Sequence, residues 1–232
     1  MESILQLVTE NSIVEFLICC MGVVSLALIF ERAKALYFDY TIKSEQFYLQ
    51  IKSLILDDKI DDAITFCSTN KKALLAHVTK SILERSDRDE NSINQGLDIS
   101  LSEIIPLLGK RLGYLSMIAN VVTLMGLLGT ITGLIMAFAA VADADPTQKS
   151  ELLAKGISMA MNTTALGLTV AIPVMIIYSF LHTKQNALLE NIAEQSSKVI
   201  DLITNRQYHE FSKKHNFPKA PNELDNLTEK AS

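Results

Sequence analysis

The residues of this sequence that could do chemistry lie in two long runs without charge, residues 112–142 and 156–181. A proton or ion path through a membrane normally requires an ionisable side chain, and neither run contains an Asp, Glu, Lys, Arg or His. They contain hydroxyl and amide groups instead. For any single Thr, a hydrogen bond back to its own preceding turn is the simpler interpretation. The threonines and asparagines among them are Asn120, Thr123, Thr130, Thr132, Asn162, Thr163, Thr164 and Thr169.

One carboxylate lies in a third apolar run. Glu15 is close to one end of residues 13–30, where a carboxylate can reach headgroups or water, so we expect it near the outer surface. If this chain carries protons, the carrier must be Glu15 or a group on another polypeptide, and Glu15 is expected to lie too near the surface. The sequence therefore predicts either a non-conducting scaffold or part of a channel whose acid comes from a partner.

The elements that position these groups are three membrane helices. A span needs about 20 residues at roughly 1.5 Å rise each, and the two charge-free runs are long enough. The composition agrees, since 49% of residues are hydrophobic and the apolar residues gather in three blocks. We predict an all-α membrane protein with three transmembrane helices, at residues 13–30, 112–142 and 156–182.

Positive charges set the expected topology. Of 21 Lys and Arg residues, 12 lie in residues 31–111, seven follow the third span, two lie between the second and third spans, and the N-terminus has none. The positive-inside rule then places the N-terminus outside and the C-terminus in the cytoplasm. The parts outside the spans are an outer N-terminus (1–12), a cytoplasmic helical region (31–111), an outer loop (143–155), a cytoplasmic helix (183–206) and a flexible tail (207–232).

The cytoplasmic region shows helical spacing, for example in Phe47, Ile51 and Ile55. Asp57-Asp58 and Asp61-Asp62 suggest a turn with helix N-caps, because short acidic side chains accept from free backbone N–H groups. A Ca²⁺ loop would need a Gly-bearing turn and alternating oxygen ligands, which this segment lacks.

Other function classes find little support. The histidines, His77, His182, His209 and His215, show no metal-ligand spacing, so no metal or other cofactor is expected. No nucleophile–base set or phosphate-cradling loop suggests an enzyme. A net charge of −5 argues against a nucleic-acid partner, while membrane lipids are an expected one.

In each of the last two spans, small residues recur every three or four positions. They therefore form one line along the helix, here called a seam. Small residues let helix backbones approach closely in lipid, and three spans offer few internal partners for so much small surface, so we also expect contacts with neighbouring copies. Thr130 and Thr164 stand out because each lies on or beside a seam. Pro173 frees a backbone carbonyl one turn earlier. Predicted helix-packing residues are Gly126, Gly129, Gly133, Gly167 and Pro173.

Two motifs resemble the MotA/TolQ/ExbB proton-channel family. Residues 111–119 (RLGYLSMIA) and 124–138 (LMGLLGTITGLIMAF) are similar to the second span of that family, and residues 156–173 (GISMAMNTTALGLTVAIP) to the third. The likeness is dense over residues 111–182, whereas residues 1–110 agree in layout only. The three-span plan resembles the ExbB/TolQ branch rather than the four-span MotA.

The resemblance implies a homopentamer in the bacterial inner membrane whose second and third spans line a pore. The pore would hold an ExbD- or TolR-like single-span partner that supplies a membrane Asp, and a TonB- or TolA-like protein would transmit the work outward. Thr130 and Thr164 match pore-lining positions of the family, and their hydroxyls would hydrogen-bond the partner's carboxyl without a charge to trap its proton. We predict that Thr163, Thr123 and Asn162 line the pore beside them.

This sequence departs from the family at two positions. Members of the ExbB/TolQ branch often have a Glu where this chain has Met159, and many have Pro where it has Thr123. Membership of a related branch of the family, one that serves another machine of the cell envelope, therefore remains an alternative. A non-conducting scaffold remains the main alternative function. An independent solute transporter fits less well, because such proteins are commonly built from inverted repeats and three spans show none.

Overall fold

The computed structural model describes residues 11–215, apart from 42, 71–72 and 143, and every regular element in that part of the chain is helical. The predicted outer N-terminus (1–12) and flexible tail (207–232) therefore lie largely outside the described residues. The chain divides into two compact units, one formed by residues 1–41 and 102–191 and the other by residues 42–101 and 192–232.

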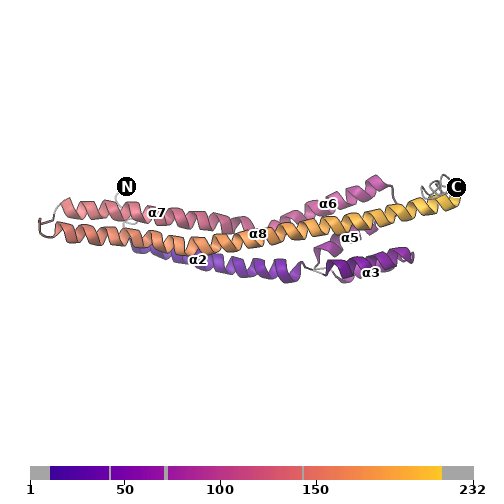
Figure 1. Cartoon of the computed structure of the whole chain (residues 1–232), viewed down its shortest axis with the longest axis horizontal. Helices are drawn as coiled ribbons and strands as arrows, with labels where there is room; N and C mark the ends of the chain where they lie inside the picture. The colour runs from indigo at the N-terminus through magenta and orange to yellow at the C-terminus, as the bar shows by residue number, and fades with distance from the viewer. Residues whose placement is uncertain (1–10, 42, 71–72, 143, 216–232) are drawn as a thin grey trace, which may run out of the picture. The chain divides into compact units, whose positions relative to one another are not determined.

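The first unit holds three helices that are long and apolar enough to cross a membrane. They are α2 (Asn11–Lys34), α7 (Leu112–Ala142) and the first part of α8 (Lys149–His215). A short link joins α7 to α8, and the two helices run antiparallel beside each other (Figure 1). The all-helical, three-span fold expected from the sequence is confirmed at this level.

Few side chains of these spans are buried inside the single chain. Large apolar residues such as Leu124, Ile131 and Phe138 on α7 and Ile172 and Phe180 on α8 are exposed. A helix that is apolar all round needs an apolar environment on its free faces, which lipid or neighbouring subunits supply. The chain is therefore a multi-pass membrane protein rather than a self-contained globular fold.

The second unit is a cluster of shorter helices. It contains α3 (Ser44–Leu56), α4 (Ile60–Thr69), α5 (Leu74–Leu83), the first part of α6 (Glu90–Gly109) and the last part of α8. The rings of Phe47 and Phe66 stack with centroids 5.5 Å apart, and Ile51 and Ile55 are buried, as the helical spacing predicted. An ion pair joins Arg206 of α8 to Asp58.

The prediction of aspartate N-caps is wrong. Lys59 occupies the N-cap of α4 without a side-chain hydrogen bond, and Asp61 and Asp62 lie inside the first turn. There they face the positive end of the helix dipole, which favours acidic residues without any cap geometry. Asp58 adopts a left-handed backbone conformation, with φ 64°, and so ends the preceding helix.

Candidate functional site

Glycines bring α7 and α8 into very close contact. A Cβ added to Gly133 would lie 2.7 Å from Ala160 Cβ, and one added to Gly126 would lie 3.2 Å from Thr164 Cα. On α8, a Cβ at Gly167 would lie 3.0 Å from the Val122 carbonyl oxygen. These distances are at or inside the closest approach of real side chains, so the backbones are nearly in contact.

Two of these contacts are tighter still, that of Gly156 with Ala137, at 2.3 Å, and that of Gly129 with Thr163. A Cβ at Gly129 would lie 2.3 Å from Thr163 Cγ2 and 2.8 Å from Thr163 Cβ. Thr163 has no exposed surface in the chain, because Gly129 leaves the space that its methyl group fills. The structure thus places Thr163, predicted to line the pore, inside the contact between the two helices.

Thr164 links the helices by a hydrogen bond. Its hydroxyl donates across the contact to the carbonyl oxygen of Gly126, at 2.7 Å. Thr130 instead donates to the carbonyl of Leu127 on its own helix, also at 2.7 Å, and is half-buried. In both residues the single hydroxyl proton is used within the chain, which leaves the oxygen as an acceptor.

The remaining predicted pore residues lie on exposed faces of the single chain. Thr123 is exposed and donates to the Ala119 carbonyl at 2.9 Å. Asn162 is exposed on α8 and lines a shallow surface hollow with Lys155, Ser158 and Met159. The small residues predicted on α7 are therefore divided, because Gly126, Gly129 and Gly133 turn toward α8 while Thr123 turns outward.

Pro173 lies within α8 and is exposed. It borders a cavity of about 230 Å³ between α2 and α8, with Gly22, Ser25 and Ile29 on the α2 side. The Ser25 hydroxyl is buried and donates to the Gly22 carbonyl on its own helix, at 2.7 Å. The helix contact predicted for Pro173 is thus loose, in contrast to the glycine contacts.

A contact that the sequence alone does not reveal joins Glu15 of α2 to the hydroxyl of Thr163 on α8. The Thr163 hydroxyl lies 3.5 Å from a carboxylate oxygen of Glu15 and 3.4 Å from the Met159 carbonyl oxygen. Glu15 is half-buried. No spacing within one segment could reveal this pair, because its members are 148 residues apart.

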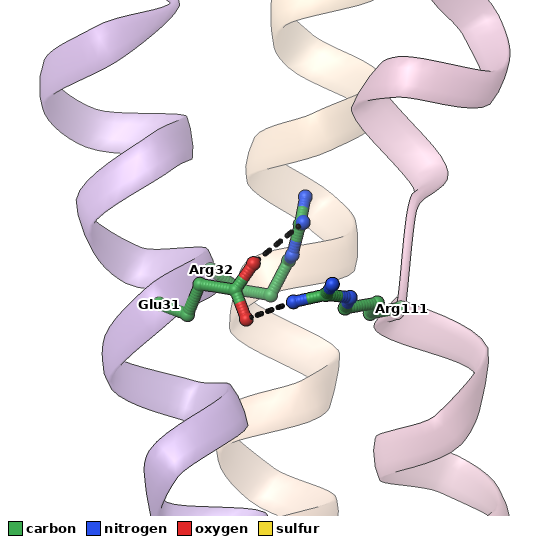
Figure 2. Close-up of polar contacts among 3 residues, drawn as sticks. All are labelled: Glu31, Arg32 and Arg111. Atoms are coloured by element: carbon green, nitrogen blue, oxygen red, sulfur yellow. Dashed lines mark hydrogen bonds and ion pairs between the residues drawn. The ribbon is translucent and has the colours of Figure 1, made fainter.

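At the other end of α2, an acidic residue bridges two arginines. Glu31 accepts from Arg111 at 2.6 Å and from Arg32 at 3.2 Å (Figure 2). The hydrogen bond from Arg111 is the main cause that lowers the pKa of Glu31 below its ordinary value. Arg111 has φ 62° and lies between α6 and α7, so this ion pair ties the start of α7 to the end of α2.

Arg32 is buried, and its Nε and Nη1 atoms have no hydrogen-bond partner among the described residues. Its Nη2 atom donates to Glu31, so the arginine keeps one charged partner. In the part of the chain that the structure describes, no three His, Cys, Asp or Glu side chains gather in a way that could hold a metal ion.

Comparison with known proteins identifies relatives of this chain. A family model described as the MotA/TolQ/ExbB proton channel family matches residues 68–194, more than half of the chain. The biopolymer transport protein ExbB of Pseudomonas putida is 26% identical over 156 residues, which cover 63% of this chain and 47% of that protein. The chain thus spans about half the length of that relative.

A second ExbB is matched over most of its length. The biopolymer transport protein ExbB of Aquifex aeolicus is 32% identical over 135 residues, which cover 58% of this chain and 84% of that protein. The solved structure of C. jejuni MotAB aligns with a TM-score of 0.56 at 14% identity, over 90% of this chain and 85% of the other. At that identity the likeness shows a shared fold.

Proposed function

Because this chain belongs to the MotA/TolQ/ExbB proton channel family, in its ExbB/TolQ-like branch, we propose that it is a ring-forming subunit of an inner-membrane proton channel. The observation that carries the proposal is the close pairing of two charge-free helical segments, residues 112–142 and 156–181, which Thr164 links by a hydrogen bond to Gly126. The chain would use the proton motive force to energise TonB-dependent transport or a related envelope process.

The hydrogen bonds explain what such hydroxyls can do for a proton carrier. Thr164 already donates its proton to Gly126, so its oxygen is free to accept. A protonated carboxyl group has an O–H to donate and fits this oxygen, whereas an ionised carboxylate would require the hydroxyl to leave Gly126. The lining therefore suits an acid that passes in its neutral form and stays mobile, because no fixed charge holds it.

The acid itself is proposed to come from a partner. Residues 112–142 and 156–181 carry no carboxylate, so an ExbD- or TolR-like single-span protein would supply the membrane Asp. Five copies of this chain would surround it, using the exposed apolar faces of α7 and α8 for contacts with neighbours. Each proton that crosses 100 mV releases about 2.3 kcal/mol, which a TonB- or TolA-like protein would carry outward as work.

In the proposed topology the N-terminus is outside and the C-terminus is in the cytoplasm. The role needs conduction and binding, with no covalent chemistry, no cofactor and no nucleic acid. Glu31, Arg32 and Arg111 would then lie at the cytoplasmic end of the spans, where charged groups reach headgroups and water.

The test combines assembly with proton flux. We expect native mass spectrometry to give five copies of the chain alone, and to add one or two partner chains on co-expression. In liposomes, the Thr130→Val/Thr164→Val double variant should lower coupled proton flux at least about tenfold, the factor that 1.4 kcal/mol supplies. Thr→Ser replacements at the same positions keep the hydroxyls and serve as the matched control.

Two results would contradict the proposal. A complex that assembles with its partner but conducts equally in the wild type and the double Val variant removes the role of the hydroxyls. Function that persists after the proton gradient is dissipated favours the alternative, a non-conducting scaffold for an envelope complex.

A further inference from the structure

The carboxyl group of Glu15 is fixed against α8 by the register of two helices. Glu15 contacts Thr163, and seven residues further along each helix a Cβ at Gly22 would lie 3.3 Å from Val170 Cγ1. Equal steps along both chains show that α2 and α8 run in the same direction with matched heights. Two turns of contact therefore hold the carboxyl beside Thr163.

Glu15 lies at the height of the candidate pore hydroxyls. Thr163 immediately precedes Thr164, and Thr163 contacts Gly129, which immediately precedes Thr130. Thr163 is also seven residues inside the charge-free run of α8, or about 10 Å along the helix. The carboxyl is thus level with the hydroxyls rather than with the end of α8, whereas its place in the sequence predicts a position near the outer surface.

The hydroxyl of Thr163 has one proton and two acceptors. The Glu15 carboxylate lies at 3.5 Å and the Met159 carbonyl at 3.4 Å, and both distances are long for an O–H···O bond, which is usually 2.5–3.0 Å. An ionised Glu15 can only accept, so it attracts the Thr163 proton. A protonated Glu15 can donate to the Thr163 oxygen, which leaves the Thr163 proton for Met159. The contact therefore differs between the two charge states.

Few charged groups compete for Glu15. On α8 the nearest in sequence is Lys155, eight residues before Thr163 or about 12 Å along the helix, and α7 has no Asp, Glu, Lys, Arg or His between residues 112 and 142. On α2 itself, the thiol of Cys19 lies one turn away. Within residues 11–30, 112–142 and 156–181, Glu15 is the only carboxylate.

We propose that Glu15 is a proton-binding residue, a carboxyl that this chain itself supplies in addition to any partner acid, and that Thr163 transmits its charge state to α7 and α8. The inference rests on the proposed channel function for its role in coupling. The Glu15 carboxylate takes up one proton from water and later returns it, and no other bond changes. Because Thr163 packs against Gly129, a movement of its side chain acts on the contact between α7 and α8, where Thr164 bonds to Gly126.

The first readout is pH-difference infrared spectroscopy on the full-length protein in liposomes, without a partner. We expect a carboxyl C=O band that responds to pH, is lost in Glu15→Gln, is kept in Glu15→Asp and shifts in Thr163→Val but little in Thr163→Ser. A spectrum that is the same in Glu15→Gln and wild type overturns the proposal. So does a Glu15 band that Thr163→Val leaves in place, because Thr163 would then not sense the carboxyl.

The second readout is the pH profile of proton flux with the partner present. We expect Glu15→Gln to lose one titration from this profile while native mass spectrometry shows an intact complex, and Glu15→Asp to keep it. An unchanged profile in Glu15→Gln overturns the coupling role. The two failures are distinct: a wild-type complex without flux contradicts the channel, whereas flux with an unchanged Glu15→Gln profile contradicts the role of Glu15 alone.

Discussion

The contact between Gly129 and Thr163 leaves no room for a side chain at residue 129, and Gly129→Ala tests this. The added Cβ would lie 2.3 Å from Thr163 Cγ2, so the side chain of Thr163 would have to rotate. Rotation does not relieve the second overlap, because Thr163 Cβ lies at 2.8 Å and stays in place when χ1 changes. The helices must therefore move apart by several tenths of an ångström or more.

The expected destabilisation follows from overpacking, which costs about 1–3 kcal/mol. Ala is a better helix former than Gly by up to about 1 kcal/mol, which offsets part of this. We expect a net loss of about 1–2 kcal/mol, or a fall in Tm of about 2–8 °C for a chain of this size. Separation of the helices also lengthens the Thr164–Gly126 hydrogen bond, so flux should fall in the same variant.

The assay is thermal unfolding of the purified complex, followed by proton flux in liposomes. Gly113→Ala on the same helix is the matched control, because nothing lies within 4 Å of its added Cβ and its Tm should be unchanged or slightly higher. Thr163→Ser removes the methyl group at 2.3 Å and should restore part of the loss when combined with Gly129→Ala. Equal Tm values for Gly129→Ala and Gly113→Ala would refute the argument that this glycine sets the distance between α7 and α8.

Three further predictions concern single groups. Thr164→Val should lower stability by about 1 kcal/mol in unfolding measurements, because it removes the hydrogen bond to Gly126, while Thr164→Ser should match the wild type. Arg111 lowers the pKa of Glu31, so the stabilisation by this ion pair is present above pH 4.5 and is lost as the pH falls further. The Tm difference between wild type and Glu31→Gln should therefore be constant from neutral pH down to pH 4.5 and then vanish. An unchanged difference at lower pH would contradict this ion pair. Burial raises the pKa of the Cys67 thiol to about 12. In a variant that lacks the other two cysteines, a maleimide at pH 8 should therefore label Cys67 slowly in the folded protein and rapidly after denaturation. Rapid labelling in the native protein would show that this helix cluster opens.

The sequence predicted the apolar helices well because length and charge decide them. A run of 31 residues without charge, as in residues 112–142, can hardly be anything but a span, whatever its neighbours. Small-residue spacing likewise marked Gly126, Gly133 and Gly167, which the structure places at the contact of α7 with α8. Local periodicity carries this information, since each residue's face follows from its position in one helix.

The parts that could not be predicted depend on which helices meet and at what height. Thr163 and Thr164 are adjacent in sequence, yet Thr163 faces Glu15 and Gly129 while Thr164 bonds to Gly126. Gly129 and Thr130 are likewise adjacent on α7, yet the glycine is buried against Thr163 whereas the threonine is only half-buried. Charge and hydropathy do not determine how far one helix is shifted along another. The pairing of Glu15 with Thr163 is therefore visible only in the three-dimensional structure.

The hydrogen bonds also explain why an acid from outside α7 and α8 is needed. Thr130 and Thr164 spend their only protons on carbonyls of the helices, which is favourable in lipid because an unsatisfied donor there is costly. A lining satisfied in this way is stable when empty, and it offers acceptors to a neutral acid without binding an ion. A charged residue on α7 or α8 themselves would hold its counterion, and its burial in lipid without a partner would cost free energy. Placing the carboxyls elsewhere, on α2 and on a proposed partner, separates the stability of the helix pair from the titration that would drive it.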